Sequence, residues 1–201
     1  RNQRVFALRR IHATAMDVAL DVRGHRVLGP TPIGHLLAVD LQALGRRRER
    51  GARRAVDFHA DGLRLDAVHA LVDNTAIHIL EELSAETDAL AGELGRPLSL
   101  IAESDLNDPR LITPRDRGGY GMTAQWDDDI HHAIHTAVSG ERQGYYADFG
   151  TMATLATTLQ NGYFHAGTYS SFRHRRHGRP LDKSLIPATR LMAYTCTHDQ
   201  V

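Results

Sequence analysis

The feature that most constrains the fold is an apolar strand, a long amphipathic helix and a second apolar strand in direct succession. The strands are predicted over about Gly62–Val68 and Leu98–Ala102. Between them, over about Thr75–Leu94, apolar residues recur every three or four positions, which is the spacing of one helix face. Strands joined by such a helix run parallel, because the helix returns the chain to the same end of the sheet. The sequence therefore predicts an α/β fold.

Caps and breakers define the ends of the predicted elements. Asp73 or Asn74 is placed to cap the first helix, and Gly95 with Pro97 is placed to end it. Five further segments are expected: a polar loop over Leu106–Gly121, a weak strand between Gly119 and Gln125, helices over about Asp128–Ser139 and Thr151–Gln160, and a last strand over about Arg190–Thr195. Residues 162–187 read as irregular.

Charged and polar side chains stand where three of the predicted strands end. The first strand carries Arg64, Asp66 and His69, the second runs into Glu103, Ser104 and Asp105, and the last runs into His198, Asp199 and Gln200. Active sites lie at this end of the strands in β/α barrels. One carboxylate at each of three strand ends predicts a site for glycoside hydrolysis.

Asp66 and Glu103 are the candidates for the two carboxyl groups of a retaining mechanism, which lie about 5–5.5 Å apart. Neighbouring strands lie about 4.8 Å apart, so adjacent strand ends match this separation. Arg64 faces the same side of its strand as Asp66 and is expected to hold it ionised. Glu103 follows an apolar run, where desolvation is expected to raise its pKa toward that of a general acid.

The other polar residues at the strand ends are expected to contact the sugar. Asp199 is the candidate for stabilising an oxocarbenium-like transition state. His69 and His198 are expected to donate hydrogen bonds to sugar hydroxyls, and Asp105 is grouped with them as a substrate-binding residue. No cofactor is expected.

Two patterns admit a metal reading that we do not favour. His131 and His135 are four apart on a predicted helix, a spacing that can bind zinc, but a helix-surface or packing role is the simpler interpretation. Asp127–Asp129 is read as acids at a helix start rather than a calcium site. No metal is therefore expected. For Trp126, Tyr145 and Tyr146, stacking on sugar rings and burial in the core both stay open.

Composition and charge divide the chain in two. Residues 1–57 hold 12 arginines against 5 acids, whereas residues 58–201 hold 12 basic residues against 19 acids. Residues 1–56 are interpreted as a divergent or misread Arg-rich segment, and residues 57–201 as a catalytic domain. Arg46–Arg54 lacks the aromatic residues of a stacking platform, so no nucleic-acid partner is expected, although a basic nucleic-acid-binding module stays a weak alternative.

The compartment is read from cysteine usage and from the absence of long apolar runs. Cys196 cannot form an internal disulfide, so a cytoplasmic location is expected, with this side chain as a small apolar filler of the last strand. No run approaches the roughly 18 apolar residues of a membrane span, and no secretory signal is recognised.

Three segments resemble signature segments of the α-amylase superfamily of glycoside hydrolases: Asp61–His69, Ile101–Asp105 and Thr197–Gln200. By this resemblance Asp66 is the nucleophile, Glu103 the acid/base and Asp199 the transition-state stabiliser. Four segments are similar to the malto-oligosyltrehalose trehalohydrolase family, namely Asp57–Ala70, Ala124–His135, Gly140–Gly150 and Arg176–Pro180. That resemblance covers about 145 of the 201 residues. It implies hydrolysis of the α-1,4 bond next to the terminal trehalose of malto-oligosyl trehalose.

The chain also departs from this family. A complete barrel has eight strands and roughly 250 residues, whereas strong signals mark three strands here, and the family's Asp…Asn-His segment before Asp57 is missing. The expectation is a partial (β/α)8 barrel, roughly its central to C-terminal strands, with open sheet edges and little activity of its own. Alternatives are a 1,4-α-glucan branching enzyme-type transferase, which the Asp199-Gln200 pair disfavours, and a non-catalytic carbohydrate-binding relative. The expected partner is malto-oligosyl trehalose or a related α-1,4-glucan, and the oligomeric state is left open.

Overall fold

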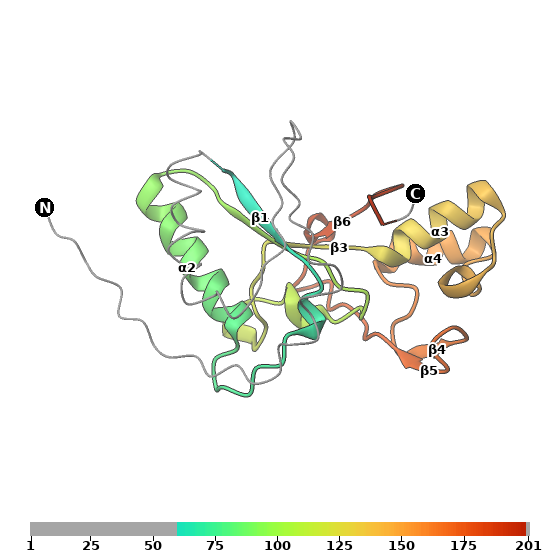
Figure 1. Ribbon diagram of the computed structural model, residues 1–201, viewed down its shortest axis with the longest axis horizontal. Coiled ribbons are helices and arrows are strands. Elements are labelled where there is room, and N and C mark those ends of the chain that lie inside the picture. Colours follow the sequence, from blue (N-terminus) through green and yellow to red (C-terminus); the bar gives the residue numbers. More distant parts are fainter. Residues whose placement is uncertain (1–59, 200–201) are drawn as a thin grey trace, which may run out of the picture.

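The computed structural model describes residues 60–199 (Figure 1). The Arg-rich segment 1–56 and Gln200 lie outside the described residues. Four strands form a parallel sheet in the order β1-β2-β3-β6: β1 Gly62–Leu65, β2 Ser99–Ala102, β3 Ala124–Trp126 and β6 Leu191–Met192. Two further strands, β4 Thr168–Ser170 and β5 Arg175–His177, form an antiparallel hairpin. The α-helices are α2 Ile79–Leu94, α3 Asp128–Ser139 and α4 Met152–Asn161.

The core lies between the sheet and α2. In the register of β1 with β2, Leu63 pairs with Leu100 and Leu65 with Ala102. Leu65, Leu100 and Ala102 are buried together with residues from α2 and the loops, among them Val68, Leu80, Ile112, Met122 and Ile186. The predicted strand-helix-strand unit is therefore confirmed, because the apolar face of α2 covers two parallel strands.

The helix ends agree with the capping residues in the sequence. The bounds of α3 are those predicted, with the carboxylate of Asp127 accepting from the backbone of Ile130 and with Gly140 in the left-handed conformation at the C-terminal end. Thr151 caps α4 as expected. The start of α2 was predicted four residues too early, and its N-terminal cap is His78 rather than the predicted Asp73 or Asn74. Asp73 binds the backbone of both Thr75 and Ile79, so the intervening residues form a loop and the helix begins at Ile79.

Two strand predictions were too long and one element was missed. β1 ends at Leu65 because Ala67 takes a left-handed conformation and leads into the 3-10 helix η2, Val68–Ala70. β6 has two residues, since the predicted strand begins with a 3-10 turn and leaves the sheet after Met192, and the predicted filler Cys196 is exposed. Residues 162–187 are not wholly irregular, because they contain the β4–β5 hairpin.

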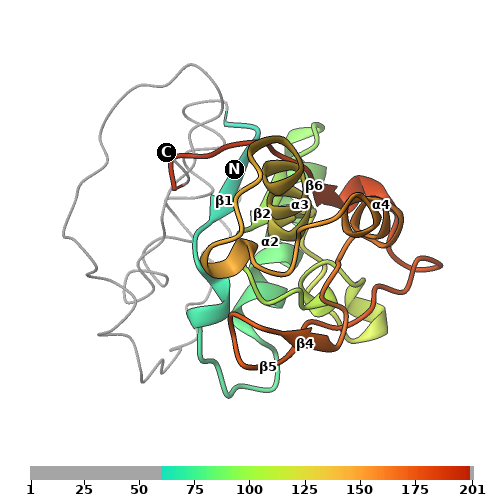
Figure 2. The same ribbon diagram turned by 90° about the vertical axis from the view of Figure 1, so that its right-hand side faces the viewer.

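The helices divide between the two ends of the molecule. Figure 1 shows α2 on one side of the sheet, and α3 with α4 on the other side, beyond the end of β3. Viewed from that end, the β4–β5 hairpin lies beneath α3 and α4 (Figure 2). The carboxyl ends of the strands therefore open toward α3 and the hairpin. Within residues 60–199, no helix is both long enough and apolar enough to cross a membrane.

Candidate active site

The ends of β1 and β2 are joined by a short set of hydrogen bonds around Glu103. The backbone N–H of Glu103 donates to the carbonyl of Leu65 at 2.9 Å, and its carbonyl accepts from Val68 at 3.1 Å. Ala67, with φ 44°, directs its own N–H at the Glu103 side chain and donates to Oε2 at 2.5 Å. The left-handed turn after β1 therefore fixes one oxygen of this carboxyl group and leaves Oε1 available.

Asp66 is held by a buried arginine. The Nη1 atom of Arg64 lies 2.5 Å from Oδ1 of Asp66, while the carboxylate of Asp66 remains about half exposed. The guanidinium carbon of Arg64 also lies 4.2 Å from the ring centroid of Trp126, at the end of β3. The expected pairing of Arg64 with Asp66 is confirmed. The aromatic support by Trp126 could not be read from the sequence.

Burial raises the pKa of Glu103, and the nearby negative charge of Asp66 raises it further. The hydrogen bond from Ala67 and the charges of Arg64 and His69 lower this pKa without cancelling the effect of burial. The direction agrees with the expectation from the apolar run before Glu103. It is the direction that a proton donor requires at neutral pH.

Asp105 connects the end of β2 to the hairpin. Its Oδ2 lies 2.5 Å from Nη2 of Arg173, its Oδ1 lies 3.9 Å from Nδ1 of His69, and its carbonyl interacts with Nε2 of His177 at 2.8 Å. Burial raises the pKa of Asp105, but the hydrogen bond and charge of Arg173 outweigh that effect and lower it. Asp105 is therefore a carboxylate neutralised by a cation. Arg173 could not be identified from the sequence, because the hairpin that carries it was not predicted.

A further carboxylate at this edge is Asp128, the first residue of α3. Its Oδ1 accepts from the hydroxyl of Tyr194 at 2.6 Å. Burial raises the pKa of Asp128 to about 6, and the charges of Glu103 and Asp105 contribute to the rise. From the sequence, Asp128 was predicted as one of three acids at a helix start, with a calcium site as the less favoured interpretation. Had β3 been recognised as a strand that ends at Trp126, the rule applied to the other strand ends would have selected it.

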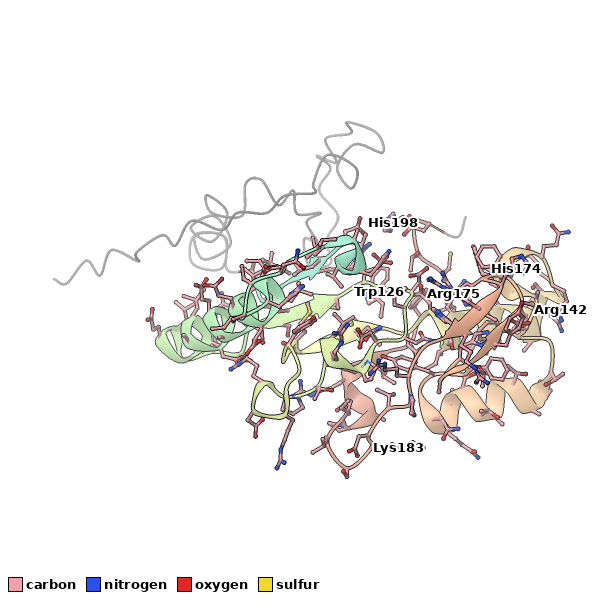
Figure 3. All side chains as sticks on the ribbon, turned by 90° about the horizontal axis from the view of Figure 1, so that it is seen from below. Trp126, Arg142, His174, Arg175, Lys183 and His198 are labelled. Atoms are coloured by element: carbon pink, nitrogen blue, oxygen red, sulfur yellow. The ribbon has the colours of Figure 1, made fainter. Side chains whose placement is uncertain are left out.

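His198 and Asp199 lie away from these contacts. His198 Nε2 is 3.3 Å from Asp199 Oδ1, both side chains are mostly exposed, and the backbone of Asp199 donates to Thr197. In Figure 3, His198 lies at the rim of the molecule, whereas Trp126, which is partly buried, lies nearer its middle in this view. The predicted site residues at the ends of β1 and β2 are thus brought together, while Asp199 keeps its contacts within its own segment.

The histidines and tyrosines beside α3 form an aromatic cluster. Tyr146 is buried and hydrogen bonds to His131 Nε2 at 3.0 Å, whereas Tyr145 stays partly exposed above His132. His135 interacts with Glu141 at 2.7 Å. The ring nitrogens considered for zinc are thus engaged by protein groups, and within residues 60–199 no cluster of three or more metal-ligating side chains is found. Of the two tyrosines, only Tyr145 offers a surface for stacking.

Known proteins resemble this chain over most of its length. It is 81% identical over 145 residues to the malto-oligosyltrehalose trehalohydrolase of Mycobacterium tuberculosis, a match that covers 72% of this chain and 25% of that protein. Over 145 residues it is also 66% identical to the enzyme of that name from Arthrobacter ramosus and 43% identical to that from Saccharolobus solfataricus, again over 72% of this chain and 25% and 24% of those proteins. The chain thus spans about a quarter of the length of these relatives.

One solved structure extends the comparison to the fold. A putative alpha amylase from Salmonella typhimurium superposes with a TM-score of 0.67 and 31% sequence identity, over 86% of this chain and 30% of that one. No protein-family model matches the chain. The parallel sheet and this neighbour confirm the prediction of a partial α-amylase-type α/β fold.

Proposed function

We propose that this chain, which is homologous to a segment of the malto-oligosyltrehalose trehalohydrolases, carries the catalytic acid and nucleophile of a retaining glycoside hydrolase that releases trehalose from malto-oligosyl trehalose. The observation that carries the proposal is the position of Asp66 and the half-buried Glu103 directly after Leu65 and Ala102, which are paired residues of adjacent strands. A charged partner holds Asp66, and burial raises the pKa of Glu103. These are the two environments that a nucleophile and a general acid require.

In the first step Glu103 gives its proton to the glycosidic oxygen while a carboxylate oxygen of Asp66 attacks the anomeric carbon. The bond to the leaving sugar breaks, and a covalent glycosyl ester forms on Asp66. In the second step Glu103, now ionised, removes a proton from water, and the water oxygen displaces Asp66 from the sugar. Because Ala67 occupies Oε2 of Glu103, the proton in this scheme is carried by Oε1.

The remaining residues have supporting roles. Arg64 orients Asp66 through their ion pair, and Asp105 with His69 supplies hydrogen bonds to sugar hydroxyls at the same rim. The assignment of Asp199 as transition-state stabiliser rests on its place after the last predicted strand and on the sequence resemblance, and that of His198 as a sugar contact rests on the same place. Tyr145 is partly exposed and supplies a ring face for stacking.

We also propose that the intact protein works in trehalose biosynthesis in the cytoplasm, on an α-1,4-glucan capped by trehalose. The single cysteine, Cys196, suits a reducing compartment. That the 201-residue chain alone has little activity remains a prediction. The chain spans about a quarter of the length of its relatives.

The proposal is tested in a chimera in which residues 60–199 replace the corresponding segment of the Mycobacterium tuberculosis relative. We expect the chimera to release free trehalose from malto-oligosyl trehalose. Glu103→Gln, which keeps the shape but cannot donate an acidic proton, is expected to lower kcat at least ~10³-fold, within the range of removing a general acid. The matched control Glu93→Gln changes an exposed glutamate of α2 and is expected to have no effect.

The two alternative functions predict different outcomes of the same assay. New branch points in the glucan would identify a branching transferase. Glucan binding without trehalose release, unchanged by Glu103→Gln, would identify a non-catalytic carbohydrate-binding relative. Either result would overturn the proposed hydrolase.

A further inference from the structure

The β4–β5 hairpin carries one residue of the candidate site, Arg173, but is not part of the sheet that carries the others. Its two strands form a separate antiparallel sheet, which lies outside the parallel sheet (Figure 1). Arg173 lies in the turn between the strands, after Ser170 and before Arg175. A two-stranded hairpin is at best marginally stable by itself in water. The position of Arg173 therefore depends on contacts that hold the turn from outside the hairpin.

Asp148, in the segment that precedes α4, holds this turn at Ser171. Its Oδ2 accepts from the backbone N–H of Ser171 at 2.8 Å, and its Oδ1 accepts from the hydroxyl of Ser171 at 2.6 Å. Hydrogen bonds to an ionised carboxylate are roughly twice as strong as those between neutral groups. Ser171 precedes Arg173 by two residues, and the backbone of Arg173 in turn donates to the hydroxyl of Ser170 at 3.3 Å. The two oxygens of Asp148 thus fix the start of the turn.

Asp148 is itself held in place by His165. Nε2 of His165 lies 3.2 Å from Oδ2 of Asp148, and Nδ1 lies 3.0 Å from the hydroxyl of Thr168 in β4. His165 is buried, its backbone N–H donates to the carboxylate of Asp129 at 2.8 Å, and its carbonyl accepts from Asn107 at 3.1 Å. Asp129 belongs to α3, and Asn107 to the loop that follows β2. The anchor of the turn is therefore fixed relative to the sheet.

The turn acts on the site through the carboxylate of Asp105. Nη2 of Arg173 lies 2.5 Å from Oδ2 of Asp105, so that oxygen is engaged by the hairpin. The other oxygen, Oδ1, lies 3.9 Å from Nδ1 of His69, at the end of β1. A turn that moved away would release Oδ2 and allow the carboxylate to rotate away from His69. The orientation of Asp105 thus depends on where the turn is held.

We propose that Asp148 is a positioning residue of the reaction site, which by binding Ser171 holds the hairpin turn where Arg173 orients Asp105 toward the substrate. The inference rests on the proposed function, in which Asp105 binds sugar hydroxyls. Asp148 does not touch the substrate in this scheme, because it acts through Arg173. It gives a role to Gly140–Gly150, one of the segments similar to the trehalohydrolase family.

The first test is kinetic and uses the chimera with the Mycobacterium tuberculosis relative. Asp148→Ala removes both bonds to Ser171. A sugar hydroxyl bound by Asp105 is bound in the ground state and in the transition state alike, so we expect KM to rise about tenfold while kcat stays within about twofold. Asp148→Asn is expected to keep KM within about threefold, because its oxygen still accepts from the Ser171 backbone and its amide can donate to the hydroxyl.

The matched control is Asp116→Ala, which removes an exposed carboxylate and is expected to leave KM and kcat unchanged. A merely structural role of Asp148 would reduce the amount of folded enzyme, and so the apparent kcat, without raising KM. That pattern in Asp148→Ala would overturn the inference.

A double-variant cycle tests whether Asp148 acts through Arg173. Arg173→Gln removes the cation that engages Asp105. In that background Asp148→Ala is expected to change KM by less than about twofold, because the contact that it positions is already lost. If the two substitutions instead multiply their separate effects on KM, Asp148 acts by another route and the inference fails.

The next test does not depend on activity. In the 201-residue chain, hydrogen exchange of the Arg173 guanidinium is followed by ¹⁵N NMR at constant pH. Asp105→Ala, which breaks the ion pair directly, gives the rate of the released side chain. Asp148→Ala is expected to speed the exchange at least about tenfold, toward that rate, whereas Asp116→Ala is expected to leave it unchanged.

The two kinds of measurement separate the inference from the proposed function. Faster exchange in Asp148→Ala supports the inference even if the chimera releases no trehalose, in which case only the proposed function fails. Exchange that is unchanged in a folded Asp148→Ala overturns the inference.

Ser171→Ala covers the case in which Asp148→Ala does not fold. It removes the exposed hydroxyl that Asp148 Oδ1 accepts from and keeps the backbone N–H that binds Oδ2. We expect a smaller change in the same direction, about threefold faster exchange of the Arg173 guanidinium. Wild-type exchange in Ser171→Ala would then contradict the proposal.

Discussion

The buried guanidinium of Arg64 contacts two groups of different kinds, the carboxylate of Asp66 and the face of Trp126. A lysine can keep the charge, but its ammonium is compact, strongly hydrated and unable to stack as a plane. The interaction with Trp126 is desolvated, because the side chain of Arg64 is 5% exposed. Such a cation–π contact contributes up to about 2 kcal/mol.

We therefore expect Arg64→Lys to lower the free energy of unfolding by roughly 1–2 kcal/mol, mainly through the lost contact with Trp126. The measurement is urea unfolding of the wild type, Arg64→Lys, Trp126→Leu and the double variant. Coupling of about 1 kcal/mol between the two positions is expected. Additive effects of the two substitutions would show that the ring and the guanidinium act independently.

His132 makes the fold sensitive to acid. Burial lowers the pKa of His132 to about 3, and the charges of His131 and Arg173 act in the same direction. A histidine with a lowered pKa contributes stability that is fully present above its unfolded value near 6.5 and is lost as the pH falls toward 3. The size of this loss is at most about 5 kcal/mol.

His132→Phe is expected to weaken this loss, because phenylalanine keeps a ring against Tyr145 and Phe149 and cannot be protonated. The measurement is the urea midpoint at pH 7 and at pH 4. The midpoints of the variant should differ by less than those of the wild type. His198→Gln, at an exposed histidine, serves as the control and should reproduce the wild-type difference. Parallel pH dependence in wild type and His132→Phe would contradict the assignment.

Among the elements, the β4–β5 hairpin depends on a glycine at its exit. Gly178 has φ +71°, and a Cβ there would overlap the carbonyl oxygen of His165. Gly167, at the entrance, has φ +95° and no atom within 4 Å of an added Cβ. The two positions share the positive φ but differ in the space available. Comparing alanine at each therefore separates steric overlap from backbone strain.

Gly167→Ala is expected to cost about 1 kcal/mol, the strain of a left-handed alanine. Gly178→Ala is expected to cost roughly 2–4 kcal/mol, because the backbone must also move away from His165. Thermal unfolding of both variants measures the difference. The hairpin carries Arg173, so the second variant should also weaken the pairing with Asp105. Equal costs at the two glycines would show that the hairpin tolerates the added atom.

The helices could be predicted closely from the sequence, whereas the hairpin was missed and the short strands β3 and β6 were predicted with the wrong bounds. Local signals define a helix: Asp127 and Gly140 at the ends of α3 act within one turn of the backbone they satisfy. β6 has two residues and takes its conformation from pairing with β3. The hairpin residues are polar and lack an alternating apolar pattern, so nothing in them predicts strands.

The candidate site, like the fold, could be predicted only in part from the sequence. Asp66 follows the short segment Gly62–Leu65, in which leucines alternate with other residues, and Glu103 follows an apolar run, so their place at strand ends could be predicted. Asp128 was not, because β3 has three residues and the three aspartates after it also satisfy the pattern of a helix start. Contacts such as Arg173 with Asp105 join residues 68 positions apart and depend on tertiary structure that no local pattern records.

For the whole molecule, the buried titrating groups fall into two sets with opposite effects on stability. Burial lowers the pKa of four histidines, so that the folded state loses stability at acidic pH. They are His78, His131, His132 and His177. Burial raises the pKa of four carboxyl groups, so that the folded state loses stability as the pH rises. They are Glu103, Asp127, Asp128 and Asp129. A histidine of the unfolded chain is half protonated at about pH 6.5, so the histidines are neutral in both the folded and the unfolded states only from about pH 7.5 upward. Only the carboxyl groups then change stability with pH.

Asp127 is the carboxyl group expected to contribute most to the loss of stability at higher pH. It is fully buried, its Oδ2 has no hydrogen-bond partner among the described residues, and burial raises its pKa well above the usual value. A carboxyl group with a raised pKa contributes stability that is present below its unfolded value and is lost as the pH rises through its folded value. This contribution therefore falls as the pH rises above about 4, the unfolded value of an aspartate, until Asp127 ionises in the folded state.

Asp127→Asn tests this at the scale of the whole fold, because the amide keeps an oxygen for the backbone of Ile130 and cannot ionise. We expect the unfolding temperature of Asp127→Asn, relative to that of the wild type, to rise as the pH is raised above about 4, because only the wild type loses the contribution of this carboxyl group. Asp116→Asn, at an exposed carboxylate, should leave the wild-type pH dependence intact. If that pH dependence persists in Asp127→Asn, the ionisation of another buried carboxyl, with Asp129 the first to examine, governs the loss at higher pH.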